Sequence, residues 1–484
     1  MKKILLPLGL FCTLSSSVWA WDQKPNHYQV NIDPQAKLAH VQANLWLDGD
    51  ELAMFAVSPT PQLKNGQAEF IKNLQVRDQS GALLALQDKG EGEYQVKGDQ
   101  RVILTYQVKL NHDDYDWPAG KEEVLYHTGE GMLASGYSLF LAPGKKMHGE
   151  TRVDFALPSG WQAHTPWRGN GGHSFTAQSR RELLNNVMFF GTARAEDISA
   201  GGIKIKLVMG KQYWPQRQVF VELIEKQMQT YLQMFGKAPL GERFMLVINQ
   251  GDSGDGGAFS GSFSQYLKGH GDLASRPVWG RVVAHELLHF WNGLSLTPRD
   301  GNEEWFKEGV TDYLTISTMS KNGLLSRDFV RQFLENLPRG QVAARRLMGL
   351  KGTVRQAYQD KHRNWLLVYG GGSIAALAMD VKLREASQGK SGLPELMRAL
   401  YAEFGQAGKS YTLDDLLRVA RQHSGLDLGP LLHPIISQEG IPDLHDLYAR
   451  IGLQLEQYGM LENYLLPKNG PGQAMFAQIF GAPY

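Results

Sequence analysis

The residues best suited to chemistry lie in the segment His285-Glu286-Leu287-Leu288-His289. On an α-helix, positions i and i+4 share one face about 6 Å apart, so His285 and His289 can present two imidazoles to one zinc ion. Glu286 lies beside them and is placed to contact a water on the metal rather than the metal itself. The alternative is a buried helix whose histidines have other partners, and each buried polar group left unpaired costs about 1–3 kcal/mol. The spacing therefore favours a catalytic zinc site.

A catalytic zinc ion needs a third protein ligand and one open position. Glu308 follows His289 after 18 intervening residues, enough for one helix to end and a second to return antiparallel. Glu303 and Glu304 are rival candidates, although acids in a first helical turn usually complement the helix dipole. Asp312 is one turn beyond Glu308 and could accept a hydrogen bond from the distal nitrogen of a ligand histidine. The alternative for Asp312 is an exposed helix acid.

The predicted secondary structure changes along the chain from strands to helices. Residues 21–205 contain short runs of β-branched and aromatic residues between turn-forming clusters, which predict an N-terminal antiparallel β domain. Its strands are expected at 27–32, 39–47, 101–110, 136–141 and 151–157. Residues 206–455 begin with strand, helix and strand and become mostly helical after about 277, with helix caps expected at Asn302 and Thr412. The chain is therefore expected to be α+β, with a catalytic domain that has a helical C-terminal lobe. Residues 456–484 are expected to be a tail.

The histidines of the β-rich part lie at no metal-ligand spacing. We expect them to be ordinary surface or loop residues. They are His112, His127, His148, His164 and His173.

The first 20 residues are typical of a secretory signal peptide. Lys2 and Lys3 precede an apolar run, and Val18-Trp19-Ala20 supplies small residues for cleavage after Ala20. The run is too short for a permanent membrane span, which is the alternative reading. The single cysteine of the chain lies in this segment, so the mature chain forms no disulfides. We expect an exported protein, periplasmic or secreted, with no stable membrane insertion after cleavage.

The composition of the 484 residues excludes several classes of protein. Their formal net charge is only +1, with 20% charged and 42% hydrophobic residues. Such values argue against disorder, and the near-zero charge gives no electrostatic footprint for nucleic acid. No nucleic-acid partner is therefore expected.

The zinc segment and its surroundings resemble the gluzincin metallopeptidases, and more closely the glycyl aminopeptidase family, peptidase family M-sixty-one. The resemblance is carried by the ending His289-Phe290-Trp291-Asn292, by the block from Glu308 to Tyr313, and by the segment that starts Tyr369-Gly370-Gly371-Gly372. It covers roughly residues 205–455 and implies a β domain followed by a thermolysin-like zincin domain. Only about 30 residues follow the last family-like helix, so we expect a member without the PDZ domain that relatives often carry.

The resemblance implies the roles of individual residues. His285, His289 and Glu308 match the zinc ligands of the family, and Glu286 matches its general base. Tyr369 matches the tyrosine that stabilises the oxyanion, although a tyrosine before three glycines could also merely pack.

One segment departs from the family pattern. Related aminopeptidases have a glutamate before the zinc helix that binds the free α-amine of the substrate, whereas Gly256 to Ser264 contains no acid. Asp252 or Asp255 could substitute. Gly256, Gly257 and Ala258 are expected to pair by backbone with an extended peptide.

The function predicted from the sequence is zinc-dependent hydrolysis of peptide bonds, with one Zn²⁺ per chain and a peptide or protein as substrate. One alternative is an aminopeptidase that removes small N-terminal residues such as Gly or Ala. Another is a non-catalytic peptide-binding protein with a structural zinc ion, but a closed site commonly needs a cysteine ligand.

Overall fold

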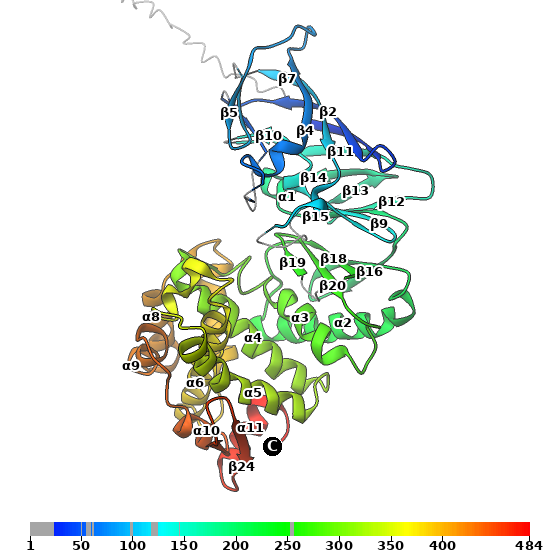
Figure 1. Cartoon of the computed structure of the whole chain (residues 1–484). Helices are drawn as coiled ribbons and strands as arrows, with labels where there is room; N and C mark the ends of the chain where they lie inside the picture. Colours follow the sequence, from blue (N-terminus) through cyan, green and yellow to red (C-terminus); the bar gives the residue numbers. More distant parts are fainter. Residues whose placement is uncertain are drawn as a thin grey trace, which may run out of the picture.

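The chain divides into a strand-rich N-terminal part and a mainly helical C-terminal part (Figure 1). The computed structural model describes residues 24–49, 51–54, 60, 62–96, 100–117, 124–144, 146–251 and 256–484. The predicted signal peptide lies outside these residues. The predicted fold class, a β domain followed by an α+β domain, is confirmed.

The largest sheet of the N-terminal part has seven strands in the order β13-β14-β11-β1-β2-β7-β4. Neighbouring strands are antiparallel except β1 and β11, which run parallel. Side chains alternate between its faces, so Tyr28 and Val30 of β1 are buried whereas Gln29 and Asn31 are exposed. The strands are β1 (Asn26–Asp33), β2 (Leu38–Trp46), β4 (Ile71–Arg77), β7 (Arg101–Lys109), β11 (Thr151–Ala156), β13 (Arg168–Gly171) and β14 (Ser174–Ala177).

Two smaller antiparallel sheets complete this part, in the orders β10-β3-β6-β5 and β12-β15-β9-β8. The strand predicted at 136–141 is instead a 3₁₀ turn, Gly136–Ser138, followed by irregular chain. The chain turns there because Gly136 lies against the backbone of Leu183, where a Cβ atom would be 2.1 Å from the carbonyl oxygen. The elements are β3 (Glu51–Ala53), β5 (Leu86–Gly90), β6 (Glu93–Val96), β8 (Tyr126–Thr128), β9 (Gly131–Ser135), β10 (Ala142–Pro143), β12 (Gln162–His164), α1 (Arg180–Leu184) and β15 (Val187–Gly191).

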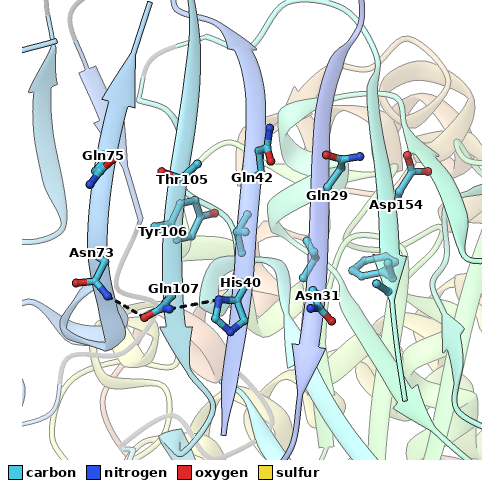
Figure 2. Close-up of a pocket in the computed structure, with 14 residues that line it drawn as sticks. Gln29, Asn31, His40, Gln42, Asn73, Gln75, Thr105, Tyr106, Gln107 and Asp154 are labelled. Carbon is cyan, nitrogen blue, oxygen red and sulfur yellow. Dashed lines mark hydrogen bonds between the residues drawn. The ribbon is translucent and has the colours of Figure 1, made fainter. Parts of the chain in front are cut away.

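The outer face of the seven-stranded sheet carries a shallow polar cavity of about 600 Å³ (Figure 2). Amide side chains dominate its lining. Nδ2 of Asn73 donates to Oε1 of Gln107 at 3.0 Å, and the amide nitrogen of Gln107 lies 3.3 Å from Nδ1 of His40. None of the site residues predicted from the sequence lines this cavity.

A five-stranded sheet begins the second domain, in the order β16-β17-β18-β20-β19. Its three central strands are parallel, and β16 and β19 lie antiparallel at the two edges. Because β16 begins at Arg194, the chain enters this sheet before the predicted boundary between 205 and 206. The elements are β16 (Arg194–Ala200), β17 (Ile203–Met209), α2 (Arg217–Phe235), β18 (Arg243–Gln250), β19 (Gly256–Ala258) and β20 (Ser262–Leu267).

Helices form the rest of the domain. Thr412 caps α8 as predicted, with a reciprocal pair of hydrogen bonds to Asp415. The predicted cap at Asn302 is wrong, because Asp300 caps a 3₁₀ turn, Gly301–Glu303, that leads into α4. The elements are α3 (Arg276–Leu288), β21 (Thr297–Pro298), α4 (Glu304–Lys321), α5 (Arg327–Val342), α6 (Gly372–Ala386), α7 (Leu393–Leu400), β22 (Ser410–Tyr411), α8 (Leu413–Ser424), α9 (Gly429–Leu432) and α10 (His445–Arg450).

Helices α4 and α6 cross at a contact between two glycines. A Cβ atom on Gly309 would lie 2.4 Å from the Cα atom of Gly372, and one on Gly372 would lie 2.2 Å from the carbonyl oxygen of Trp305. The contact brings the π-helical turn Leu366–Gly371 against α4. In the part of the chain that is described, the helical run Leu366–Ala386 is long and apolar enough to cross a membrane, but 78% of its most apolar 18-residue stretch is buried, as in the core helix of a folded domain.

The C-terminal residues pack into the helical lobe. Strands β23 (Leu453–Gln457) and β24 (Asn463–Pro467) form a hairpin, and α11 (Gly472–Phe480) follows. The hydroxyls of Ser317 and Ser320 on α4 donate to the carbonyl oxygens of Ile479 and Phe480 at 2.6 and 2.8 Å. Residues 456–484 therefore belong to the lobe, unlike the expected tail. The apolar periodicity of α11 is too short to predict this.

The two parts contact each other beside β19. Oδ1 of Asn186 accepts hydrogen bonds from the backbone of Gly261 at 2.8 Å and from the hydroxyl of Ser262 at 3.0 Å. Oδ1 of Asn185 accepts one from the backbone of Ser260 at 2.8 Å. The N-terminal part therefore fixes the chain that follows β19.

Candidate active site

Three side chains come together at helices α3 and α4: His285 in the last turn of α3, His289 directly after that helix, and Glu308 on α4. One ligand atom from each lies within 4.8 Å of the others. Nε2 of His285 and Nε2 of His289 are each 3.2 Å from Oε2 of Glu308. Neighbouring ligand atoms of a tetrahedral zinc ion, with bonds of about 2.0–2.1 Å, are about 3.3 Å apart. The spacing of the two histidine–glutamate pairs therefore matches a zinc site.

In each imidazole, a hydrogen bond at Nδ1 fixes the ring so that Nε2 faces Glu308. Nδ1 of His289 lies 2.7 Å from the carbonyl oxygen of Asn292 and must donate, because a carbonyl only accepts. In the neutral imidazole, Nε2 then carries a lone pair and faces the carboxylate of Glu308. Nδ1 of His285 lies 3.2 Å from Oδ1 of Asp312, which orients that ring in the same way. Three electron-pair donors therefore converge on one point, an arrangement that a cation satisfies.

Two lysines contact the other oxygen of Glu308. Nζ of Lys361 is 2.7 Å from Oε1, and Nζ of Lys307 is 3.1 Å from it. Both lysines also contact Oε1 of Glu304, at 2.8 and 3.0 Å. Burial alone raises the pKa of Glu308, but His289 and Lys307 outweigh it and hold that pKa well below its ordinary value. Glu308 is therefore ionised, as a metal ligand must be.

Asp312 is held between the zinc helix and an arginine. Nη1 of Arg281 lies 3.4 Å from Oδ2 of Asp312, whose Oδ1 faces His285. Burial raises the pKa of Asp312, but Arg281 and His285 lower it below its ordinary value. The same contact acts on His285: burial lowers its pKa, while the hydrogen bonds that it donates to the carboxylates of Asp312 and Glu308 raise it to about 10.

Tyr369 lies on the π-helical turn Leu366–Gly371, a type of distortion that is frequent at functional sites. The centroid of its ring is 6.0 Å from that of His285, and Nζ of Lys361 is 5.6 Å from the centroid of the Tyr369 ring. Burial and then the negative charges of Glu308 and Glu286 raise the pKa of Tyr369 well above its ordinary value. Its hydroxyl therefore keeps its proton and can donate.

One cavity of about 710 Å³ joins these groups. Glu286, His289 and Tyr369 line it, and so does β19, with the three predicted substrate-binding residues Gly256, Gly257 and Ala258. Glu286 is half-buried, and its carboxylate has no hydrogen bond or ion pair with any described residue. An edge strand beside a free carboxylate is suited to an extended peptide. Asp252 and Asp255 lie outside the described residues.

Glu303 and Glu304, the alternative candidates for the third metal ligand, have other partners. Oε1 of Glu303 accepts hydrogen bonds from Arg355 at 2.7 Å and from the backbone of Leu413 at 3.1 Å. Glu304 bridges Lys307 and Lys361. Neither acid belongs to the cluster of converging atoms.

The sequence analysis assigned no role to three residues near the site. Lys307 and Lys361 neutralise Glu308 and Glu304, and Asn292 joins the two ligand helices. Nδ2 of Asn292 donates to the carbonyl oxygens of Phe306 and Lys307, both at 3.2 Å. The sequence analysis names Asn292 only as part of the family-like ending of the zinc segment. No local signal identifies Lys361, because its contact with Glu308 spans 53 positions.

Comparison with known protein families gives one match, in the N-terminal part of the chain. The model described as the Peptidase M61 N-terminal domain matches residues 27–192, which supports a peptidase. This match supports the resemblance to the M61 family that was inferred from the sequence.

Solved structures show the same fold. The structure is similar to that of an aminopeptidase N family protein from Idiomarina loihiensis, with a TM-score of 0.74 and 20% sequence identity over 89% of this chain and 79% of that one. No curated protein matches the sequence.

Proposed function

We propose that this chain is an exported zinc peptidase that hydrolyses peptide bonds. The observation that carries the proposal is the convergence of His285, His289 and Glu308 on one point, beside the carboxylate of Glu286, which has no partner among the described residues. A structural zinc ion would leave that carboxylate without a purpose, which argues against a non-catalytic peptide-binding protein.

His285, His289 and Glu308 would hold the zinc ion, which when bound supplies a Lewis acid that acidifies water and polarises a carbonyl group. Asp312 and the carbonyl oxygen of Asn292 fix the orientation of the two imidazoles. Lys307 and Lys361 hold the carboxylate of Glu308 in place.

Glu286 and Tyr369 perform the proton transfer and the charge stabilisation. Glu286 takes a proton from the water that attacks the scissile carbonyl carbon, and then delivers it to the leaving amine. The hydroxyl of Tyr369 donates a hydrogen bond to the carbonyl oxygen as negative charge develops there. Backbone groups of β19 align the peptide as an added strand.

An aminopeptidase is the second candidate, favoured by the likeness to an aminopeptidase N family structure. A peptide and its N-acetylated form separate the two candidates, since an aminopeptidase rejects the blocked form. Zinc dependence is tested on the same substrates by chelation and readdition of the metal. Loss of cleavage on chelation supports the proposal, and cleavage by the metal-free protein contradicts it.

We also propose that residues 1–20 direct export and are removed after Ala20. The support is the charged start, apolar run and small residues of that segment. N-terminal sequencing of the protein recovered from outside the cytoplasm should begin at Trp21, whereas an intact Met1 in that fraction contradicts the proposal.

A further inference from the structure

The cleft does not end at the catalytic cavity. A second cavity of about 640 Å³ lies between the two parts of the molecule. Arg181, Ser260 and Leu294 line both cavities, so the two adjoin at these residues. A substrate that occupies the cavity of Glu286 can therefore continue along the cleft, past the end of β19.

Among the described residues, the charged groups that line the catalytic cavity favour an anion over an ammonium group. A desolvated ammonium group needs a paired carboxylate. The described residues that line the catalytic cavity include two carboxylates, Glu286 and Glu308, and both are assigned to the reaction. Lys307 and Lys361 are already paired with acids. The guanidinium of Arg181 has no carboxylate partner in the described parts of the chain.

Arg181 is held in a defined position. Its Nε donates to Oγ of Ser260 at 2.9 Å. Oδ1 of Asn185 fixes Ser260, because it accepts from both the hydroxyl at 2.6 Å and the backbone nitrogen at 2.8 Å. The side chain is exposed, and its Nη atoms form no hydrogen bond that the structure shows. A guanidinium fixed in this way is suited to bind a carboxylate with both Nη groups.

We propose that Arg181 binds a carboxylate of the substrate where the two cavities meet, so that the preferred substrates are acidic peptides cleaved within their chain. The proposal rests on the proposed peptidase function and names its substrate class. A peptide that continues past Arg181 has no free amine at this end of the catalytic cavity.

The test uses peptides that are blocked at both ends, with a single Asp moved through successive positions and Asn as the uncharged match. For the zinc-loaded wild type, kcat/KM should be about tenfold higher for Asp than for Asn at one position. Arg181→Gln should abolish this preference, so that kcat/KM becomes equal for the Asp and Asn peptides. Raising NaCl to about 1 M should weaken the preference by screening.

Arg152→Gln is the matched control, because Arg152 is an exposed arginine of the same domain that lines neither cavity. It should leave the preference unchanged. Equal kcat/KM for Asp and Asn at every position contradicts the proposal, and so does a preference that survives in Arg181→Gln. Cleavage restricted to peptides with a free amine also contradicts it.

A binding assay separates this proposal from the proposed function. Fluorescence anisotropy of the same labelled peptides is measured on zinc-loaded Glu286→Gln and on the double variant with Arg181→Gln. The Asp peptide should bind about tenfold more tightly than the Asn peptide to the first protein and equally to the second. If the wild type cleaves no peptide, the peptidase function fails, while the anisotropy difference still decides whether Arg181 recognises a carboxylate.

Discussion

Glu286 is the residue on which the proposed chemistry depends most directly. Its carboxylate faces the cavity without a partner among the described residues, whereas the other acids of the site are tied to cations. Glu286→Gln should lower kcat by about 100- to 10,000-fold because proton transfer is lost. Zinc content and the midpoint of thermal unfolding should remain close to those of the wild type. Wild-type turnover by this variant contradicts the mechanism.

A separate prediction concerns Tyr369, whose hydroxyl donates a hydrogen bond to the developing oxyanion. Tyr369→Phe keeps the ring and its packing but removes the donor. We expect kcat to fall by about 100- to 1000-fold, with little change in KM or zinc content. Steady-state kinetics on an N-acetylated peptide give the split between kcat and KM, and an unchanged kcat removes Tyr369 from the site.

Asn292 should matter for the metal rather than for the chemical step. Its carbonyl orients His289, and its side chain binds the backbone of α4, which carries Glu308. Asn292→Ala should weaken zinc affinity by about 10- to 100-fold, as measured by competition with a chromophoric chelator. Asn302→Ala, in the turn before α4, is the control and should leave the affinity unchanged. Equal affinities for the two variants contradict the role of Asn292.

The sequence predicts the ligand residues well because their geometry is local. The spacing of His285 and His289 is a property of one helix, and the return to Glu308 needs only a short loop. Lys361 belongs to a different kind of contact, since it reaches Glu308 through the tertiary packing of a distant segment. Residue types and spacing in one sequence do not reveal such contacts.

At the scale of elements, the glycine crossing of α4 and α6 sets the distance between Glu308 and Tyr369. Gly309→Ala would place a methyl group 2.4 Å from the Cα atom of Gly372. The helices must separate, so we expect a loss of about 1–3 kcal/mol in the free energy of unfolding together with a lower kcat. Chemical denaturation and kinetics on the zinc-loaded protein measure both effects.

Gly340→Ala is the matched control for the helix crossing. Gly340 lies inside α5, where the nearest atom to an added Cβ is the end of the Leu366 side chain at 3.4 Å. Alanine has the higher helix propensity, so this variant should be as stable as the wild type or slightly more stable. If Gly309→Ala behaves like Gly340→Ala, the crossing does not position the site.

Elements with a strong local pattern were predictable, and those set by tertiary contacts were not. The alternation in β1, β2 and β7 identifies these strands within one residue at each end. The segment 136–141 has β-forming residues, but close packing against α1 makes it turn at Gly136. The sequence pattern does not reveal that helix α11 packs into the lobe. Its position is set by hydrogen bonds from α4, such as the one that Ser317 donates to the carbonyl oxygen of Ile479.

At the scale of the whole molecule, the N-terminal domain contains a histidine that links stability to pH. His112 is fully buried, contrary to the sequence expectation, and its ring stacks on Phe70 with centroids 3.8 Å apart. Burial lowers the pKa of His112 to about 3. Below about pH 6.5 the unfolded chain binds a proton that the folded chain does not. The contribution of His112 to stability is therefore complete above pH 6.5 and decreases as the pH falls toward 3.

His112→Leu should remove this dependence. Between pH 7 and pH 4, the unfolding free energy of the wild type minus that of the variant should fall, by up to about 1.4 kcal/mol per pH unit. Thermal or urea unfolding of both proteins at each pH measures the difference, in which the other titrating groups cancel. A difference that is constant over this range contradicts the assignment.

The central claim is that His285, His289 and Glu308 hold one catalytic zinc ion. The most direct measurement is the metal content per chain, determined together with peptidase activity before chelation, after chelation and after readdition of zinc. We predict one zinc ion per chain, loss of metal and activity together, and recovery of both with one equivalent of zinc for the wild type but not for His289→Ala. Peptidase activity in the metal-free protein, or full zinc content in His289→Ala, would contradict the account.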